Sequence, residues 1–369
     1  MDNPDRQAAA QEQISHVINA LALISQHQRT GRDFGQGDGL TGRQRMIRGQ
    51  HGVRCGQAAM AKDRIDIFQL SQGYRWNFLD DPVRKVLFER MTQSWQSVLA
   101  RSMENVMPVI VTEQMIEDYQ RDGVVMIKGL WKDWVEDLRA GVARNMAEPG
   151  PYAAENLKPG EGGRFFDDYC NWNRISEFER VIRDSEAAEV AARLMGSQRV
   201  QLFHDHVLVK EPGTSKPTPW HQDGPYYFVA GRQTVSLWSP LDPVKEASLR
   251  CVAGSHLWPK EVLPKRWLSD TSFYPDPEKY MAVPDPDAEG MQVMEWEMAP
   301  GDAVAFNYLT LHGARGNETA QRRRAFSLRL VGEDARYVER PGQTSPPYPG
   351  HGMVAGQRLR EDWFPVLRG

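Results

Sequence analysis

The sequence is poor in cysteine. Only Cys55, Cys170 and Cys251 occur among 369 residues, and no two of them form a C-x-x-C pair. Disulfide-stapled domains and cysteine-ligated zinc sites both need more cysteines at closer spacing. We therefore expect neither feature, and the composition fits a reducing compartment.

The chain also lacks an excess of positive charge. It has 45 Lys and Arg against 49 Asp and Glu, for a net charge of −4. A protein that follows a phosphate backbone needs a basic surface, which this balance does not supply. We predict no nucleic-acid partner.

Long apolar runs are missing as well. The candidate near the start, VINALALI from Val17, is much shorter than the roughly 18 residues of a membrane span. The preceding MDNPDRQ lacks the basic flank of a secretory signal, and the final PVLRG is not a peroxisomal address. We expect a cytoplasmic protein that does not contact membranes.

The N-terminal part carries little that could form a core. The segment from Gly31 to Gly56 holds eight glycines and a single aromatic residue, Phe34. So little apolar surface cannot offset the entropy lost on ordering. We predict a partly disordered arm over residues 1–102, with short helices around Gln11–Ser25 and Pro82–Leu99, outside the fold formed by residues 103–369.

The chain after Pro108 has regular helix and strand signals. A helix is expected from the cap Thr112 to Gly123, then a strand over Val124–Ile127, a second helix around Val135–Met146 and a third between Glu177 and Leu194. Six short β-rich runs separated by Pro, Gly and Asp turns follow: RVQLFHDHVLVKEP, QTVSLWSPL, SLRCVAGSH, MQVMEWEM, DAVAFNYLTLHGA and RRRAFSLRLVG. Helices first and strands later favour the α+β class, with a double-stranded β-helix, or jelly roll, as the core.

One short stretch carries the strongest chemical signal. In PWHQDGPYYFVAG, His221 and Asp223 stand two residues apart, and in a strand both would project to the same face. His312 ends another predicted strand. Two imidazoles and one carboxylate on one face of a metal leave positions open for substrate and O₂, as in non-heme Fe(II) oxygenases. Zinc with the same ligands, activating water, remains an alternative.

Two other histidines compete for a metal role. His204 and His206 in FHDHVLV have the same spacing, but no glutamate follows them on the strand. We interpret them as pocket-wall or structural residues.

Three consecutive arginines precede the last long predicted strand. Alternation puts Arg322 and Arg324 on the face of Phe326, whereas Arg323 shares a face with the smaller Ala325. An arginine fork beside small residues suits bidentate capture of a carboxylate, such as the distal carboxylate of 2-oxoglutarate. Surface solvation of all three arginines is the alternative.

These motifs occur in the order seen in a known family. KEPGTSKPTPWHQDGPYY, SLWSPLDPV, VAGSHLW and LHGARGNETAQRRRAFS resemble the phytanoyl-CoA dioxygenase family of Fe(II)/2-oxoglutarate-dependent oxygenases, over about Pro108 to Arg336. The resemblance implies that Fe(II) is bound by His221, Asp223 and His312, with Arg323, eleven residues after His312, on 2-oxoglutarate.

The resemblance extends to further residues and to the reaction. It implies that Trp238 lies beside the co-substrate and that Lys210 and His206 form the other wall, while Ala314 stands where relatives often carry a hydroxyl. The implied activity is hydroxylation of an unactivated C–H bond of a small organic substrate with O₂, releasing succinate and CO₂. A zinc hydrolase with the same triad and a non-catalytic jelly-roll binding protein are the alternatives.

The walls of the site are predicted from aromatic clusters and one long connection. Seven aromatic residues beside the ligands or in RFFDDYCNW are candidates: Tyr226, Tyr227, Phe228, Phe165, Phe166, Tyr169 and Trp172. The connection from Trp258 to Glu289 has the length of a lid or binding loop.

Overall fold

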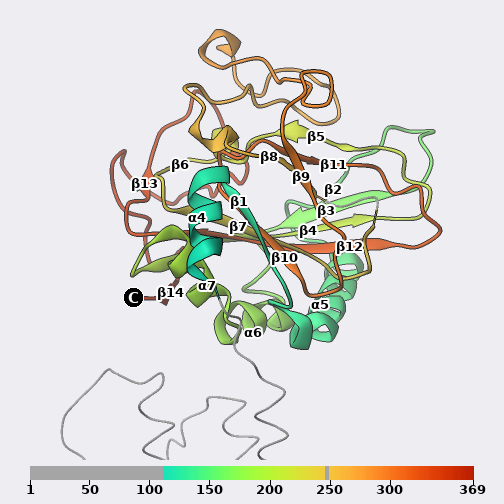
Figure 1. Ribbon diagram of the computed structural model, residues 1–369, viewed down its shortest axis with the longest axis horizontal. Coiled ribbons are helices and arrows are strands. Elements are labelled where there is room, and N and C mark those ends of the chain that lie inside the picture. The colour runs from blue at the N-terminus through green and yellow to red at the C-terminus, as the bar shows by residue number, and fades with distance from the viewer. Residues whose placement is uncertain (1–110, 246–248) are drawn as a thin grey trace, which may run out of the picture. The chain divides into compact units, whose positions relative to one another are not determined.

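The computed structural model describes residues 111–245 and 249–369 (Figure 1). The predicted arm over residues 1–102 and its two helices lie outside the described residues. No helix in the described ranges is long and apolar enough to span a membrane. The cytoplasmic location and the lack of a nucleic-acid partner stay predictions.

The helices lie early in the described chain. The α-helices are α4 (Glu113–Asp122), α5 (Val135–Ala147), α6 (Ser176–Asp184) and α7 (Ala187–Met195). Short 3-10 helices are η1 (Lys132–Trp134), η2 (Gly224–Tyr226), η3 (Ser255–Leu257) and η4 (Pro277–Lys279). As predicted, α4 starts where the Thr112 side chain accepts from the Met115 N–H and ends at Gly123, whose φ of 73° suits glycine.

The prediction of a single helix between Glu177 and Leu194 is wrong. The chain breaks into α6 and α7, and Ser185 after α6 has an extended backbone, with φ −83° and ψ 169°. The Ser185 hydroxyl accepts a hydrogen bond from the indole N–H of the buried Trp131 at 3.1 Å. This side-chain contact, which no local pattern reveals, accompanies the break in the helix.

Antiparallel strands make up the rest of the fold. Their bounds are β1 (Val124–Ile127), β2 (Ala154–Glu155), β3 (Phe165–Tyr169), β4 (Val200–Lys210), β5 (Thr218–His221), β6 (Val229–Ala230), β7 (Thr234–Pro240), β8 (Leu249–Val252), β9 (Val293–Glu295), β10 (Ala303–Phe306), β11 (His312–Ala314), β12 (Arg323–Val331), β13 (Arg336–Tyr337) and β14 (Val366–Arg368). An eight-stranded sheet has the order β1-β10-β7-β12-β4-β3-β2, with β14 also on β4, and a four-stranded sheet has the order β5-β11-β8-β9. The predicted α+β class with a jelly-roll core is confirmed.

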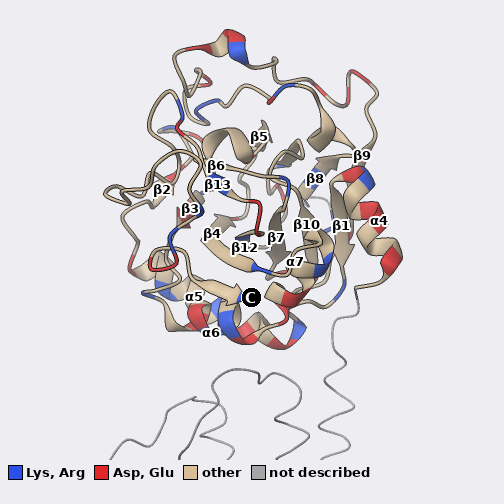
Figure 2. Ribbon diagram, turned by 90° about the vertical axis from the view of Figure 1, so that its left-hand side faces the viewer, with Lys and Arg blue, Asp and Glu red and all other residues tan. Residues whose placement is uncertain are grey.

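The alternation of β12 divides the interior into two layers. Phe326, Leu328 and Leu330 pack in the cluster that includes the helices, while Ala325 packs with Trp238 toward the smaller sheet. Figure 1 shows α5, α6 and α7 on the side of the large sheet away from β5, β8 and β11. Figure 2 shows both acidic and basic residues on α4, α5 and α6. The helices therefore cover one face of the large sheet and leave the other face for a site.

The run DAVAFNYLTLHGA, predicted as one strand, is two strands in different sheets. β10 belongs to the large sheet and β11 to the small one. Between them the Asn307 side-chain oxygen accepts from the Leu309 N–H at 3.0 Å, and the Asn307 carbonyl accepts from the Thr310 N–H at 2.9 Å. This tight corner carries the chain from one sheet to the other and places His312 at the start of β11.

Candidate active site

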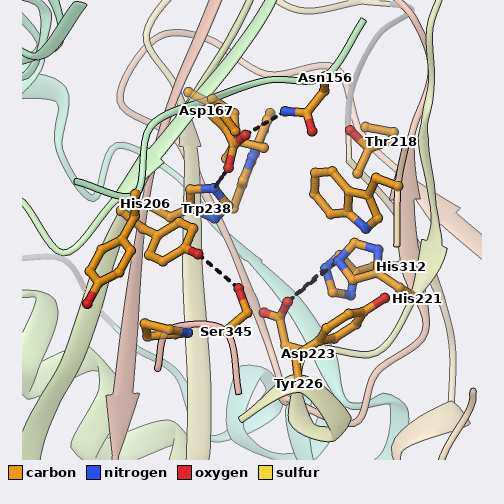
Figure 3. Close-up of a pocket in the computed structure, with 18 of the residues that line it drawn as sticks. Asn156, Asp167, His206, Thr218, His221, Asp223, Tyr226, Trp238, His312 and Ser345 are labelled. Carbon is orange, nitrogen blue, oxygen red and sulfur yellow. Dashed lines mark hydrogen bonds and ion pairs between the residues drawn. The ribbon is translucent and has the colours of Figure 1, made fainter. Parts of the chain in front are cut away.

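The three predicted ligands meet at one point between the sheets. His312 and His221 are direct partners in the β11–β5 pair, and their ring centroids are 4.2 Å apart. The Asp223 Oδ1 atom lies 3.6 Å from His221 Nε2 and 3.7 Å from His312 Nε2 (Figure 3). All three side chains are buried.

The expectation that Asp223 continues the strand of His221 is wrong. β5 ends at His221, and Asp223, with φ −70° and ψ −43°, caps the 3-10 helix η2. Gly224 then packs so tightly that a Cβ there would lie 2.7 Å from the Leu309 side chain. The Asp223 carboxylate lies beside both imidazoles, but it reaches them from a turn of the backbone and not from a strand.

Backbone carbonyls orient both imidazoles. His221 Nδ1 lies 2.7 Å from the Pro219 carbonyl, and His312 Nδ1 lies 2.9 Å from the Thr310 carbonyl. A carbonyl only accepts, so each Nδ1 carries the proton and each Nε2 presents a lone pair. Burial, and after it the neighbouring His221, lowers the pKa of His312 to about 3, which keeps that imidazole neutral.

The donor set fits a first-row metal ion. The donor atoms of His221, Asp223 and His312 all lie within 4.8 Å of one another. The two carboxylate-to-imidazole separations, 3.6 and 3.7 Å, are shorter than twice a metal–ligand bond of about 2.1 Å, so one ion can contact all three. Orienting hydrogen bonds on the far side of each imidazole are typical of built metal sites.

The second oxygen of Asp223 is held by protein groups. Oδ2 accepts from the Ser236 hydroxyl at 3.1 Å and from Arg329, whose Nη2 is also 3.1 Å away. Burial by itself raises the pKa of Asp223, but the Arg329 guanidinium and then the imidazoles outweigh burial and hold this pKa well below its usual range. Asp223 can therefore offer Oδ1 to a metal while Oδ2 is occupied.

Sequence reasoning missed Arg329, which contacts the predicted ligand Asp223. Arg329 lies on β12 six positions after Arg323, so the alternation that assigns Arg323 to the inner face also assigns Arg329 to it. The period-two pattern could have found it. Its partner Asp223, however, is distant in sequence.

The structure places Arg323 on the inner face of β12, as the alternation predicted, while its role toward 2-oxoglutarate stays a prediction. Arg323 is buried and lines the cavity, whereas Arg322 pairs with Glu211 and Arg324 with Asp242 on the opposite face. Lys210 faces Arg323 across the β4–β12 pair.

Lys210 and Arg323 place two basic side chains side by side in a buried region. Burial and then the charge of Arg323 lower the pKa of Lys210 to about 6, and burial lowers the pKa of Arg323 to about 10. Lys210 Nζ donates to the carbonyls of Lys216 and Arg315. A buried guanidinium beside a buried amine suits a carboxylate ligand, whose negative charge would favour the charged form of Lys210.

Comparison with known proteins identifies the family. A model of the family described as phytanoyl-CoA dioxygenase (PhyH) matches residues 119–325. The chain belongs to the phytanoyl-CoA dioxygenase family. The family predicted from the motifs is thus confirmed.

Individual relatives agree with this family. A probable phytanoyl-CoA dioxygenase of Caenorhabditis elegans is 30% identical over 55% of this chain and 62% of its own length. The epimerase SnoN, solved in complex with Fe3+, alpha ketoglutarate and nogalamycin RO, is 23% identical, with a TM-score of 0.56 over 69% of this chain and 98% of that one. The carbocyclase SnoK is 22% identical, with a TM-score of 0.55 over 69% and 96%. The two solved structures support the fold.

In this phytanoyl-CoA dioxygenase family member, one cavity of about 460 Å³ is lined both by the triad and by Lys210 and Arg323. Trp238 and His206, both predicted near the co-substrate, line it. His206 lies 3.0 Å from the Asp167 carboxylate, across the cavity from the triad in Figure 3. His204 also lines the cavity, but neither His204 nor His206 belongs to the metal-compatible group.

The aromatic predictions are partly right. Tyr226, Tyr227 and Tyr169 line the cavity. The remaining four candidates do not line it, and they are Phe228, Phe165, Phe166 and Trp172. The long connection supplies Trp267 and Phe273 to the wall, as a binding loop would, and a C-terminal segment that sequence reasoning missed supplies Ser345 and Pro346.

Replacing Arg329 by methionine is expected to lower the free energy of unfolding of the metal-free protein by about 3 kcal/mol, because Asp223 would stay buried without its guanidinium. Urea unfolding followed by tryptophan fluorescence measures this change. Arg322→Met is the matched control: its pair with Glu211 is partly exposed, so a loss below about 1 kcal/mol is expected. Equal losses in the two variants would contradict the proposed support of Asp223.

Proposed function

We propose that this protein is an Fe(II)- and 2-oxoglutarate-dependent dioxygenase that hydroxylates an unactivated C–H bond of a small organic substrate and releases succinate and CO₂. One observation carries the proposal: the metal-compatible triad and a buried Arg–Lys pair line the same cavity. A metal triad alone fits several chemistries, whereas the added carboxylate-binding corner favours a keto-acid co-substrate.

His221 Nε2, Asp223 Oδ1 and His312 Nε2 would hold the iron. Bound iron, with 2-oxoglutarate and O₂, supplies the oxidising power for the C–H bond. The carbonyl bonds at Nδ1 select the tautomer in which each neutral imidazole presents Nε2 as an acceptor, and Arg329 keeps Asp223 ionised. These residues therefore prepare the site before any ligand arrives.

Arg323 and Lys210 would receive the distal carboxylate of 2-oxoglutarate. Arg323 offers a planar fork, and the neighbouring Lys210 amine offers further donors and would take up a proton more readily once the carboxylate is bound. Ala314 also lines the cavity and offers no hydroxyl to the co-substrate. Trp238 forms an apolar wall of the same cavity.

The type of oxidation is a separate part of the proposal. The similar solved structures are described as an epimerase and a carbocyclase, so this fold supports outcomes other than hydroxylation. We favour hydroxylation, which needs no residue beyond the metal and co-substrate groups. A product heavier than its substrate by one oxygen atom, labelled from ¹⁸O₂, is the expected result.

The two alternatives account for fewer of the residues. A zinc hydrolase with the same triad leaves the buried Arg323 and Lys210 without a task. In a non-catalytic binding protein, the orientation of the Nε2 atoms of His221 and His312 would have no function. Both alternatives predict that 2-oxoglutarate is not consumed.

Succinate release tests the proposal. The purified protein is expected to form succinate from 2-oxoglutarate only when Fe(II) and O₂ are present, and a screen across acyl thioesters, small metabolites and polycyclic scaffolds should find compounds that stimulate this release. Zn(II) in place of Fe(II) should give none. The dioxygenase proposal would be refuted if the protein hydrolysed one of the screened compounds with Zn(II), or if it turned over no 2-oxoglutarate under any condition.

A further inference from the structure

The cavity is covered by a stretch of the long connection, Glu261–Phe273, which we call the roof segment. Five consecutive residues of it, from Lys265 to Ser269, line the cavity. The Trp267 ring lies edge-on to the imidazole of His221, with centroids 5.2 Å apart. The roof segment therefore presents an indole directly beside a proposed metal ligand.

The roof segment contributes little to the hydrophobic core. Val262 near its start and Tyr274 directly after its end are buried, but Trp267 between them is only half-buried and Leu268 is 43% exposed. Internal backbone bonds, such as Arg266 N–H to the Thr271 carbonyl, make the segment a local loop. Backbone bonds of Glu261 and Leu263 with Met281 hold its start, and the stretch from Lys265 to Ser269 depends on polar anchors elsewhere in the chain.

Tyr226 is the central anchor. Its phenolic oxygen accepts from the Lys265 N–H at 2.8 Å and donates to the Lys265 carbonyl at 2.7 Å. The same ring packs edge-on against Phe273, with centroids 5.1 Å apart. Tyr226 stands three residues after Asp223, so one hydroxyl ties the roof segment to the stretch that carries two proposed ligands.

Two further anchors hold the start of the roof segment to the same stretch. The buried Gln222, between the two proposed ligands, accepts from the Val262 N–H at 2.7 Å. Arg340 donates to the Gly224 carbonyl at 2.9 Å and pairs with Glu261 at 2.9 Å. Arg340 lies beyond residues 119–325, which the family model matches, so this anchor comes from the chain's own C-terminal part.

We propose that Tyr226 is a positioning residue that fixes the roof segment over the metal, and that Trp267, placed by it beside His221, determines which substrates enter. The proposal rests on the proposed function, because a substrate must approach the metal past this indole. Its structural part, the fixing of the roof segment, can be tested without any turnover.

Limited proteolysis tests the structural part on the full, metal-free chain. Trypsin cleaves after Lys265 and Arg266, and cleavage requires the roof segment to leave Tyr226. Tyr226→Phe removes two hydrogen bonds, so the initial rate of cleavage at these sites, measured by mass spectrometry, is expected to rise about tenfold. Tyr274→Phe is the matched control, since the Tyr274 hydroxyl is buried and has no hydrogen-bond partner among residues 111–245 and 249–369. Its cleavage rate should equal that of the wild type.

Equal cleavage of Tyr226→Phe and Tyr274→Phe would overturn the positioning role, whether or not the protein turns over 2-oxoglutarate. Faster cleavage of Tyr226→Phe would support that role even if no turnover were found, so the two proposals fail separately.

Kinetics test the specificity part, with the most stimulating compound from the succinate screen as the probe. Tyr226→Phe is expected to raise the KM for that compound about tenfold and to raise the share of succinate released without product. The KM for 2-oxoglutarate should not change. Trp267→Ala should alter the ranking of compounds in the screen. The specificity role would be refuted if Trp267→Ala left the ranking of compounds unchanged. It would also be refuted if Tyr226→Phe raised only the KM for 2-oxoglutarate.

Discussion

Asp223→Ala is expected to abolish iron-dependent succinate release, with a loss well above the 10- to 100-fold typical of residues that only support metal ligands. The variant removes the single carboxylate of the triad, so two neutral imidazoles would remain to hold Fe(II). Succinate formation at saturating 2-oxoglutarate measures the loss. Fe(II) binding, followed by anaerobic titration, should weaken in parallel.

The Asp223→Ala variant also changes the stability of the protein, because Asp223 is paired with the buried Arg329. Asp223→Ala leaves Arg329 buried without its carboxylate, which we expect to cost about 3 to 5 kcal/mol of stability. Two further variants separate the loss of the metal ligand from the loss of stability. Asp223→Asn keeps an oxygen that can accept from Ser236 and Arg329. The double variant Asp223→Ala with Arg329→Met removes the unpaired guanidinium together with the carboxylate. Circular dichroism should show a folded Asp223→Asn protein without turnover. Full activity in this folded protein would remove Asp223 from the ligand set.

Arg323→Ala is expected to raise the KM for 2-oxoglutarate about a hundredfold, while Fe(II) affinity stays close to that of the wild type. Losing one partner of a buried, hydrogen-bonded charge pair typically costs about 2 to 5 kcal/mol, and about 1.4 kcal/mol corresponds to a tenfold change in affinity. Arg323 lies in the cavity wall but outside the metal-compatible triad, so iron binding should not depend on it.

Neighbouring arginines supply the controls for this experiment. Arg322→Ala removes the same charge one residue earlier, from a side chain that pairs with Glu211 outside the cavity, and should leave the KM for 2-oxoglutarate unchanged. Arg323→Lys keeps the charge without the fork and should give an intermediate KM. If Arg322→Ala and Arg323→Ala shift the KM equally, general electrostatics and not a specific carboxylate contact would be responsible.

Local patterns predicted the elements whose signals lie within a few residues. The cap at Thr112, the glycine stop at Gly123 and the inner face of Arg323 all follow from contacts between near neighbours in sequence. The break between α6 and α7 could not be predicted this way, because it coincides with a hydrogen bond from Trp131.

The sequence by itself determined the family and the fold class and predicted the three side chains of the triad, because the motifs and their order can be read along the chain. Only the tertiary structure decided that Asp223 reaches the imidazoles from a turn, that Arg329 neutralises it, and that Tyr226 ties the roof segment above them. Each of these depends on a contact between residues far apart in sequence. Burial gives such contacts their strength, and burial exists only after the two sheets have closed over the site.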